Sequence, residues 1–119
     1  MKEIVLPWPH SSLSPNSRVH WAEKSRHNKS TKNYAWAATL EAKIKLVEGP
    51  IDLHITFRPA DKRRRDIDNM IASCKGLLDG VALGLGVDDS RFRLHLEVGE
   101  PMRGGAVVIK LSQQGRIAA

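Results

Sequence analysis

Residues 51–70 read IDLHITFRPADKRRRDIDNM, and they join two different patterns through a short turn. In the first eight residues apolar and polar side chains alternate, which predicts a half-buried β-strand because successive side chains point to opposite faces. After the turn, four consecutive cations at residues 62–65 run directly into Asp66 and Asp68. The stretch therefore predicts a strand whose end leads into a junction carrying both signs of charge.

A helical apolar face follows this junction. Its members recur at spacings of three and four residues, and they are Met70, Ile71, Cys74, Leu77, Leu78, Val81 and Leu85. We expect one helix that ends near Gly84 or Gly86, because glycine is favoured just past a helix C-terminus. The run Asp88-Asp89-Ser90 predicts the turn that follows.

The chain before residue 51 predicts a short strand, a long loop and a helix. Glu3–Leu6 has strand character and is stopped by Pro7. Residues 9–30 are rich in turn-forming residues and have no apolar period, which predicts a loop. From Thr31 onward a helix is expected, with an apolar stripe formed by Trp36, Leu40, Ile44 and Val47.

The chain after residue 91 predicts two strands. Residues 92–98 alternate cleanly, and residues 101–105 resemble a hairpin connection into a last strand at 106–111. The expected order is β-α-β-α-β-β in one domain spanning residues 1–119, with a mixed sheet and two helices. The fold class is α/β in the loose sense, nearer to α+β.

Composition limits the function. The net charge of +6 and the pI of about 9.8 favour an anionic partner. The one cysteine excludes an internal disulfide and a Cys-rich zinc site. No apolar run approaches the roughly 18 residues needed to cross a bilayer, so we expect a cytoplasmic protein without a membrane partner.

The two aspartates of the junction suggest a metal site. Side chains at i and i+2 of an extended chain point to the same side, and two adjacent carboxylates repel unless a cation lies between them. Hard oxygen ligands suit Mg²⁺ or Mn²⁺. Asp88 or Asp89 could supply a third carboxylate if the helix returns the chain beside Asp66 and Asp68.

The cations of the junction then have a consistent role. Lys62, Arg63, Arg64 and Arg65 could bind backbone phosphates while the aspartates hold the metal. A simpler interpretation stays open, in which Asp68 or Asn69 caps the helix and the basic run is a solvated surface.

Several motifs together resemble the RusA family of Holliday-junction resolvases. They are RRRDIDN at residues 63–69, LLDG at 77–80, GVDDS at 86–90, VLPWP at 5–9 and SPNSRVHW at 14–21. The resemblance implies a homodimeric, Mg²⁺-dependent endonuclease that cuts four-way DNA junctions with paired symmetric nicks, leaving a 5′-phosphate and a 3′-hydroxyl. Mn²⁺ is expected to substitute for Mg²⁺.

The resemblance also assigns the metal ligands. Asp66 and Asp68 match the family's paired metal-binding aspartates, and Asn69 matches the asparagine that follows them. Asp89 matches the third acidic residue, with Asp88 as the alternative because the spacing is slightly longer here.

The family's catalytic lysine does not align directly. It lies four residues after the second aspartate, and that position is Ala72 in this chain. Lys75 is expected to take the role, because on a continuous helix it would lie two turns from Asp68 and on the same face.

A second group of cations lies between residues 18 and 32. Its members are Arg18, Lys24, Arg26, Lys29 and Lys32, against the single acid Glu23. They could grip the arms of a DNA junction, or they could form a solvated loop. Trp8, between two prolines, is interpreted as a packing anchor, Trp36 as core and Cys74 as a buried apolar residue.

Two other functions remain compatible with the sequence. One is a nuclease specific for flaps or replication forks that uses the same metal site. The other is a basic DNA-binding protein without catalysis, in which the aspartates only cap a helix.

Overall fold

β2 (Ile51–Arg58) is an internal strand of the sheet, and its alternating apolar residues face the core. The computed structural model describes residues 3–15, 17–63, 65–113 and 116–117. In it, β2 pairs with β3 (Phe92–Val98) on one side and with β4 (Ala106–Gln113) on the other. The remaining elements, in chain order, are β1 (Glu3–Pro7), η1 (Ser11–Leu13), α1 (Trp21–Ala42), α2 (Ile67–Ser73), α3 (Lys75–Leu85), η2 (Asp89–Arg91) and β5 (Arg116–Ile117).

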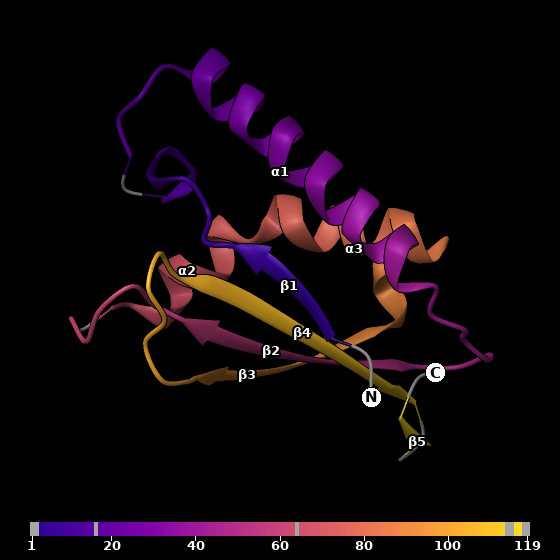
Figure 1. Cartoon of the computed structure of the whole chain (residues 1–119). Coiled ribbons are helices and arrows are strands. Elements are labelled where there is room, and N and C mark those ends of the chain that lie inside the picture. Colours follow the sequence, from indigo (N-terminus) through magenta and orange to yellow (C-terminus); the bar gives the residue numbers. More distant parts are fainter. Residues whose placement is uncertain (1–2, 16, 64, 114–115, 118–119) are drawn as a thin grey trace.

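The expected α+β class is confirmed, as a mixed sheet with its helices on one face (Figure 1). The strand order is β1-β4-β2-β3, with β5 paired to β4. Apolar residues of β2 and β4 that face the helices form the core, and they include Leu53, Phe57, Ile109 and Leu111. In the part of the chain that the structure describes, no helix combines the length and apolarity needed to cross a membrane.

The expected hairpin between the last two long strands is wrong. β3 and β4 are not neighbours, because β2 lies between them. β3 instead pairs parallel to β2, with Ile51 opposite Phe92 and Phe57 opposite Val98. Parallel strands need a long crossover, and α2 and α3 provide it. The loop from β3 therefore carries the chain past β2 to its far side.

The second expected helix is two helices. α2 ends at Ser73 and α3 begins at Lys75, with Cys74 between them at φ −94° and ψ 5°. The apolar spacing continues across this break, which is why the sequence pattern predicts one helix. Gly86 ends α3 with a left-handed backbone at φ 71°, whereas Gly84 lies inside the helix.

Glycines bring α3 very close to α1. A Cβ atom added to Gly80 would lie 2.3 Å from the backbone oxygen of Lys32 and 2.7 Å from the Cβ of Ala35. A Cβ atom on Gly84 would lie 2.7 Å from that of Thr39. Small residues therefore form the contact between α1 and α3, which cross in Figure 1.

This close contact overturns the expected core stripe of α1. Ala35 and Thr39 are buried, whereas Trp36 and Leu40 are 41% and 47% exposed. Large side chains would hold the helices too far apart, so the small residues take the buried face. Ile44 and Val47 lie beyond the end of the helix.

The expected loop at residues 9–30 is also shorter than predicted. α1 already begins at Trp21, where the ring Nδ1 of His20 accepts a hydrogen bond from the backbone N–H of Ala22. Residues 21–30 have no apolar period because much of this half of α1 is exposed to solvent. Residues 21–30 therefore continue, as an exposed helix, the half of α1 that packs against α3.

Candidate active site

The loop from β2 to α2 is folded by an acidic residue that precedes the cations. Asp61 accepts hydrogen bonds from the backbone N–H of Arg63 at 2.9 Å and from the guanidinium groups of Arg63 and Arg65, each at 3.1 Å. The backbone N–H of Arg63 and these guanidinium groups hold the pKa of Asp61 below its ordinary value. The basic run is therefore partly neutralised by a neighbour that the sequence analysis did not use.

The cations of this loop differ in accessibility. Lys62 is exposed, and 80% of the Arg63 side chain is exposed, against only 21% for Arg65. The Arg65 guanidinium donates to the backbone oxygens of Asp61 and Arg63 and lies 5.7 Å from the ring centre of Trp8. Lys62 and Arg63 can thus reach a phosphate, whereas Arg65 orders the loop. Arg64 lies outside the described residues.

The aspartate pair lies at the start of α2, as the sequence predicts. Asp66 is the N-cap, and its Oδ1 accepts a hydrogen bond of 2.9 Å from the backbone N–H of Asp68. The cap is therefore neither Asp68 nor Asn69. Both carboxylates are exposed, and within the described residues no hydrogen bond reaches the second oxygen of Asp66.

The two candidates for a third carboxylate have different environments. Asp88 caps η2 and accepts a hydrogen bond from the backbone N–H of Ser90. The Ser90 hydroxyl and backbone N–H lower the pKa of Asp88. Asp89 is exposed and has no such partner among the described residues. Asp89 is consequently the more available ligand of the two.

The structure does not gather the predicted acids into one cluster. Among the described residues, no three Asp, Glu, His or Cys side chains lie close enough to hold a metal together. Asp66 and Asn69 share one cavity, whereas Asp89 and Lys75 share another hollow. Asp66 and Asn69 therefore lie on one hollow of the described surface and Asp89 on another.

The hollow that contains Asp89 is here named the β3 groove. It has a volume of about 410 Å³ and runs between α2, α3 and β3, with Ile71, Leu78 and Leu94 as apolar walls. Lys75 and Ala72 both line it. The break at Cys74 makes the expected continuous helix from Asp68 to Lys75 wrong, but Lys75 still faces the same groove as Ala72.

The lysine groove is a larger hollow of about 580 Å³ between α1 and the junction of α2 with α3. Its charged lining residues are Lys24, Lys29, Lys32, Lys75 and Asp79. No ion pair joins any of these lysines to a carboxylate of the described residues. Arg18 and Arg26 are exposed but do not line the groove. A single acid faces four cations, so the groove favours an anion.

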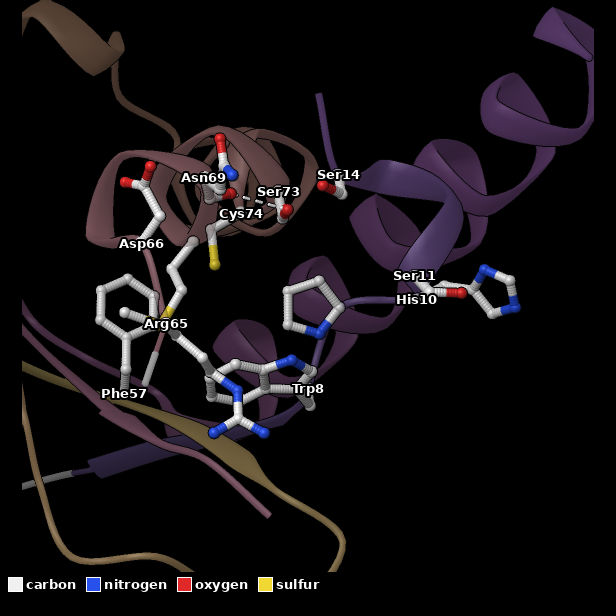
Figure 2. Close-up of a pocket in the computed structure, with 12 residues that line it drawn as sticks. Trp8, His10, Ser11, Ser14, Phe57, Arg65, Asp66, Asn69, Ser73 and Cys74 are labelled. Atoms are coloured by element: carbon white, nitrogen blue, oxygen red, sulfur yellow. Dashed lines mark hydrogen bonds between the residues drawn. The ribbon is translucent and has the colours of Figure 1, made fainter. Parts of the chain in front are cut away.

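The Trp8 cavity is a smaller hollow of about 230 Å³ beside Asp66 (Figure 2). Trp8, Phe57, Met70 and Cys74 form its apolar lining, and Asp66 and Asn69 border it. Burial raises the pKa of the Cys74 thiol to about 12, so this group is uncharged. Sequence reasoning missed the cavity because three distant segments converge to form it.

Comparison with known proteins gives one clear relationship. No protein-family model matches the sequence. An uncharacterized protein of Xylella fastidiosa strain Temecula1 is 41% identical over 117 residues, which cover 94% of this chain and 76% of that protein. Identity at this level over nearly the whole chain establishes a common fold and ancestry. The chain therefore belongs to the same protein family as this uncharacterized protein of Xylella fastidiosa.

Proposed function

We propose that the protein is a Mg²⁺-dependent endonuclease of the RusA type that resolves four-way DNA junctions by paired symmetric nicks, in recombination and repair. The observation that carries this proposal is the exposed pair Asp66 and Asp68 in the same loop region as the exposed cations Lys62 and Arg63, with Asp66 three residues after Arg63. Metal-assisted hydrolysis of a phosphodiester uses carboxylates to hold the metal and cations to bind phosphate, and here both lie close together in the chain.

The donor set suits Mg²⁺. This ion usually keeps several waters and takes one or two carboxylates in sites that process phosphates. Asp66 and Asp68 offer two carboxylates at one helix start. Asp89 is proposed as the third ligand in preference to Asp88, which is engaged as a cap, and it would have to approach α2 to join them because Asp66 and Asp89 line separate hollows. Bound Mg²⁺, or Mn²⁺ in its place, would supply Lewis-acid activation of water and of the phosphoryl oxygens.

The other residues bind and orient the DNA. Lys62 and Arg63 would neutralise phosphates next to the aspartates, and Arg65 would hold their loop in place through Asp61. Lys75 would stabilise negative charge on the phosphoryl group and the leaving 3′-oxygen. The lysine groove offers a second phosphate path that ends at Lys75, which also lines the β3 groove.

The assembly follows from the symmetry of the substrate. One chain carries one carboxylate set, whereas resolution needs two opposed cuts. Two copies related by a two-fold axis would supply two sites with matching symmetry. We therefore propose a homodimer acting on DNA in the cytoplasm.

One observation favours a different function. Asp66 caps α2, which is the role it would have in a basic DNA-binding protein without catalysis. That protein would bind branched DNA through the same cations but would not nick it when Mg²⁺ is added.

The deciding experiment incubates the purified protein and Mg²⁺ with a synthetic four-way junction, a linear duplex and a flap. We expect paired nicks in the junction that a ligase can seal. Asp66→Asn and Asp68→Asn should abolish cleavage while keeping junction binding, because each removes a metal ligand and a negative charge beside the phosphate. Glu41→Gln, an exposed charge change in the last turn of α1, is the control and should cut normally.

The alternatives give different results in the same assay. Preferential cutting of the flap would indicate the flap or fork nuclease. Tight junction binding without nicks would indicate the non-catalytic protein. Normal cleavage by Asp66→Asn or Asp68→Asn would contradict the metal site.

A further inference from the structure

Trp8 is held rigidly at the edge of the Trp8 cavity. Its ring meets Phe57 edge-on, with centroids 6.3 Å apart and an interplanar angle of 72°. A Cβ atom added to Gly105 would lie 3.0 Å from the Cβ of Trp8, so no space remains behind it. Pro7 and Pro9 restrict the backbone on either side. The indole is therefore a fixed wall of the cavity.

The cavity combines flat apolar surface with a few polar groups. Phe57, Met70 and Cys74 are each at least 93% buried, and the side chain of Trp8 is partly exposed. The side-chain amide of Asn69 makes no hydrogen bond with the described residues, so its donor and its acceptor are both available. Apolar pockets with a small number of polar groups are the usual form of a site for a ring-shaped ligand.

The surroundings indicate which ring-shaped ligand fits. Asp66 borders the cavity, and the cations Lys62 and Arg63 precede it in the same loop. The Arg65 guanidinium lies against the indole, adding positive charge beside the aromatic surface (Figure 2). A ligand that is aromatic at one end and anionic at the other meets both conditions, and a nucleotide is such a ligand.

We propose that the Trp8 cavity binds the base of an unpaired nucleotide whose phosphate lies beside Asp66. The base would stack on the indole of Trp8, and its edge would hydrogen-bond to Asn69. In taking DNA as the source of the base, this inference rests on the proposed function. At a branch point bases are already unpaired, so placing one in the cavity costs less than extracting it from a duplex.

Tryptophan indole N–H signals in a nuclear magnetic resonance spectrum provide the test without cleavage or metal. The chain has three tryptophans, and Trp21 and Trp36 on α1 serve as internal controls. Each signal is assigned by its Trp→Phe variant. The ligands are a single strand of roughly eight nucleotides, within the range of single-strand site sizes, a strand of equal length without bases, and free deoxynucleoside monophosphates.

The base-bearing strand should shift the Trp8 signal, and the strand without bases should not. Asn69→Ala should weaken the affinity read from Trp8 several-fold. Ser11→Phe, at the exposed rim of the cavity, should prevent the shift. Loss of base stacking should weaken strand binding by about 5- to 100-fold, as ~1–3 kcal/mol of stacking implies.

An unmoved Trp8 signal, or equal shifts with both strands, would overturn the inference. A shift with free monophosphates and none with the strand would overturn DNA as the source and indicate a free-nucleotide site. These outcomes are separable from the proposed function. Junction cleavage with an unmoved Trp8 signal would contradict only the proposed base site. A shift of the Trp8 signal without any cleavage would contradict only the proposed nuclease activity.

Discussion

Asp66 has two roles that use different oxygens of the same carboxylate. Its Oδ1 accepts the backbone N–H of Asp68 and caps α2, which leaves the other oxygen for a metal. An amide at this position keeps the oxygen that caps but loses the charge. Asparagine caps helices about as well as aspartate, whereas alanine cannot. Substitutions at Asp66 can therefore separate its effect on folding from its effect on chemistry.

We expect Asp66→Ala to lower the free energy of unfolding by about 0.5–2 kcal/mol, the usual cost of a lost N-cap. Asp66→Asn should change the free energy of unfolding by no more than a few tenths of the loss expected for Asp66→Ala, because asparagine retains the cap. Urea denaturation followed by circular dichroism measures both. Equal losses for the two variants would show that the charge of Asp66, and not the cap, stabilises the fold.

At the scale of elements, the loop from β2 to α2 contains two kinds of cation. Asp61 pairs with both Arg63 and Arg65, but the side chains of Lys62 and Arg63 face solvent, whereas that of Arg65 is mostly buried against Trp8. Exposure thus separates Lys62 and Arg63, which can bind DNA, from Arg65, which shapes the loop. The two kinds should respond differently to replacement.

Replacing Lys62 and Arg63 together by alanine should weaken junction binding and flatten its salt dependence. The log–log slope should fall by about 0.9 for each phosphate contact that is lost, because fewer counterions are released. Fluorescence anisotropy across a salt series measures the slope. Lys45→Ala, before the opposite end of β2, is the control and should leave the slope unchanged. An unchanged slope in the double variant would place the loop away from DNA.

The contact between α1 and α3 depends on glycine in a helix interior. Alanine favours helix over glycine by about 1 kcal/mol, so Gly80→Ala would stabilise an isolated α3. In the protein its Cβ would lie 2.3 Å from a backbone oxygen of α1, which no side-chain movement relieves. The overlap with α1 should therefore cost more stability than the higher helix propensity of alanine contributes.

We expect Gly80→Ala to destabilise the protein by about 1–3 kcal/mol, the usual cost of overpacking a core. Gly76→Ala should cost less, because its Cβ would lie 3.2 Å from the nearest atom, the backbone oxygen of Asn28, which is a much smaller overlap. Thermal unfolding of the two variants makes the comparison. A Gly80→Ala protein more stable than wild type would mean that α1 and α3 separate at little cost.

At the scale of the whole molecule, one sheet edge remains apolar and accessible. Two parts of the chain could form a dimer contact, the glycine-rich end of α3 and the apolar strands near the C-terminus. The glycines of α3 pack against α1 of the same chain, so this surface is not available for a dimer contact. On the edge strand β3, Leu94 and Val98 are 43% and 55% exposed, and Leu94 lines the β3 groove beside Asp89. We therefore expect the dimer contact at β3.

Light scattering of the wild-type protein at micromolar concentration should give about twice the chain mass of 13.2 kDa, without DNA. Leu94→Lys should yield a monomer, because it places a charge in the apolar contact. Val5→Lys, an exposed position on β1 at the other side of the sheet, is the matched control and should remain a dimer. A wild-type protein that stays monomeric on a junction would contradict paired cutting and favour a flap nuclease that makes one cut.

The sequence by itself determined the features that arise between near neighbours in the chain. The strands at 51–58 and 92–98 follow from alternation, which sorts side chains to two faces whatever the rest of the protein does. The positions of Asp66 and Asp68 beside the cations follow from covalent adjacency, and capping of α2 needs only the local backbone. The resemblance to a nuclease family rests on these same short motifs.

Only the tertiary structure decided the features that depend on distant segments. The buried face of α1 is Ala35 and Thr39, not Trp36 and Leu40, because the glycines of α3 allow an approach that large side chains would prevent. β3 pairs with β2 and not with β4, because the crossover through α2 and α3 returns the chain to the free edge of β2. The Trp8 cavity joins three separate segments, and no local pattern records which of them meet.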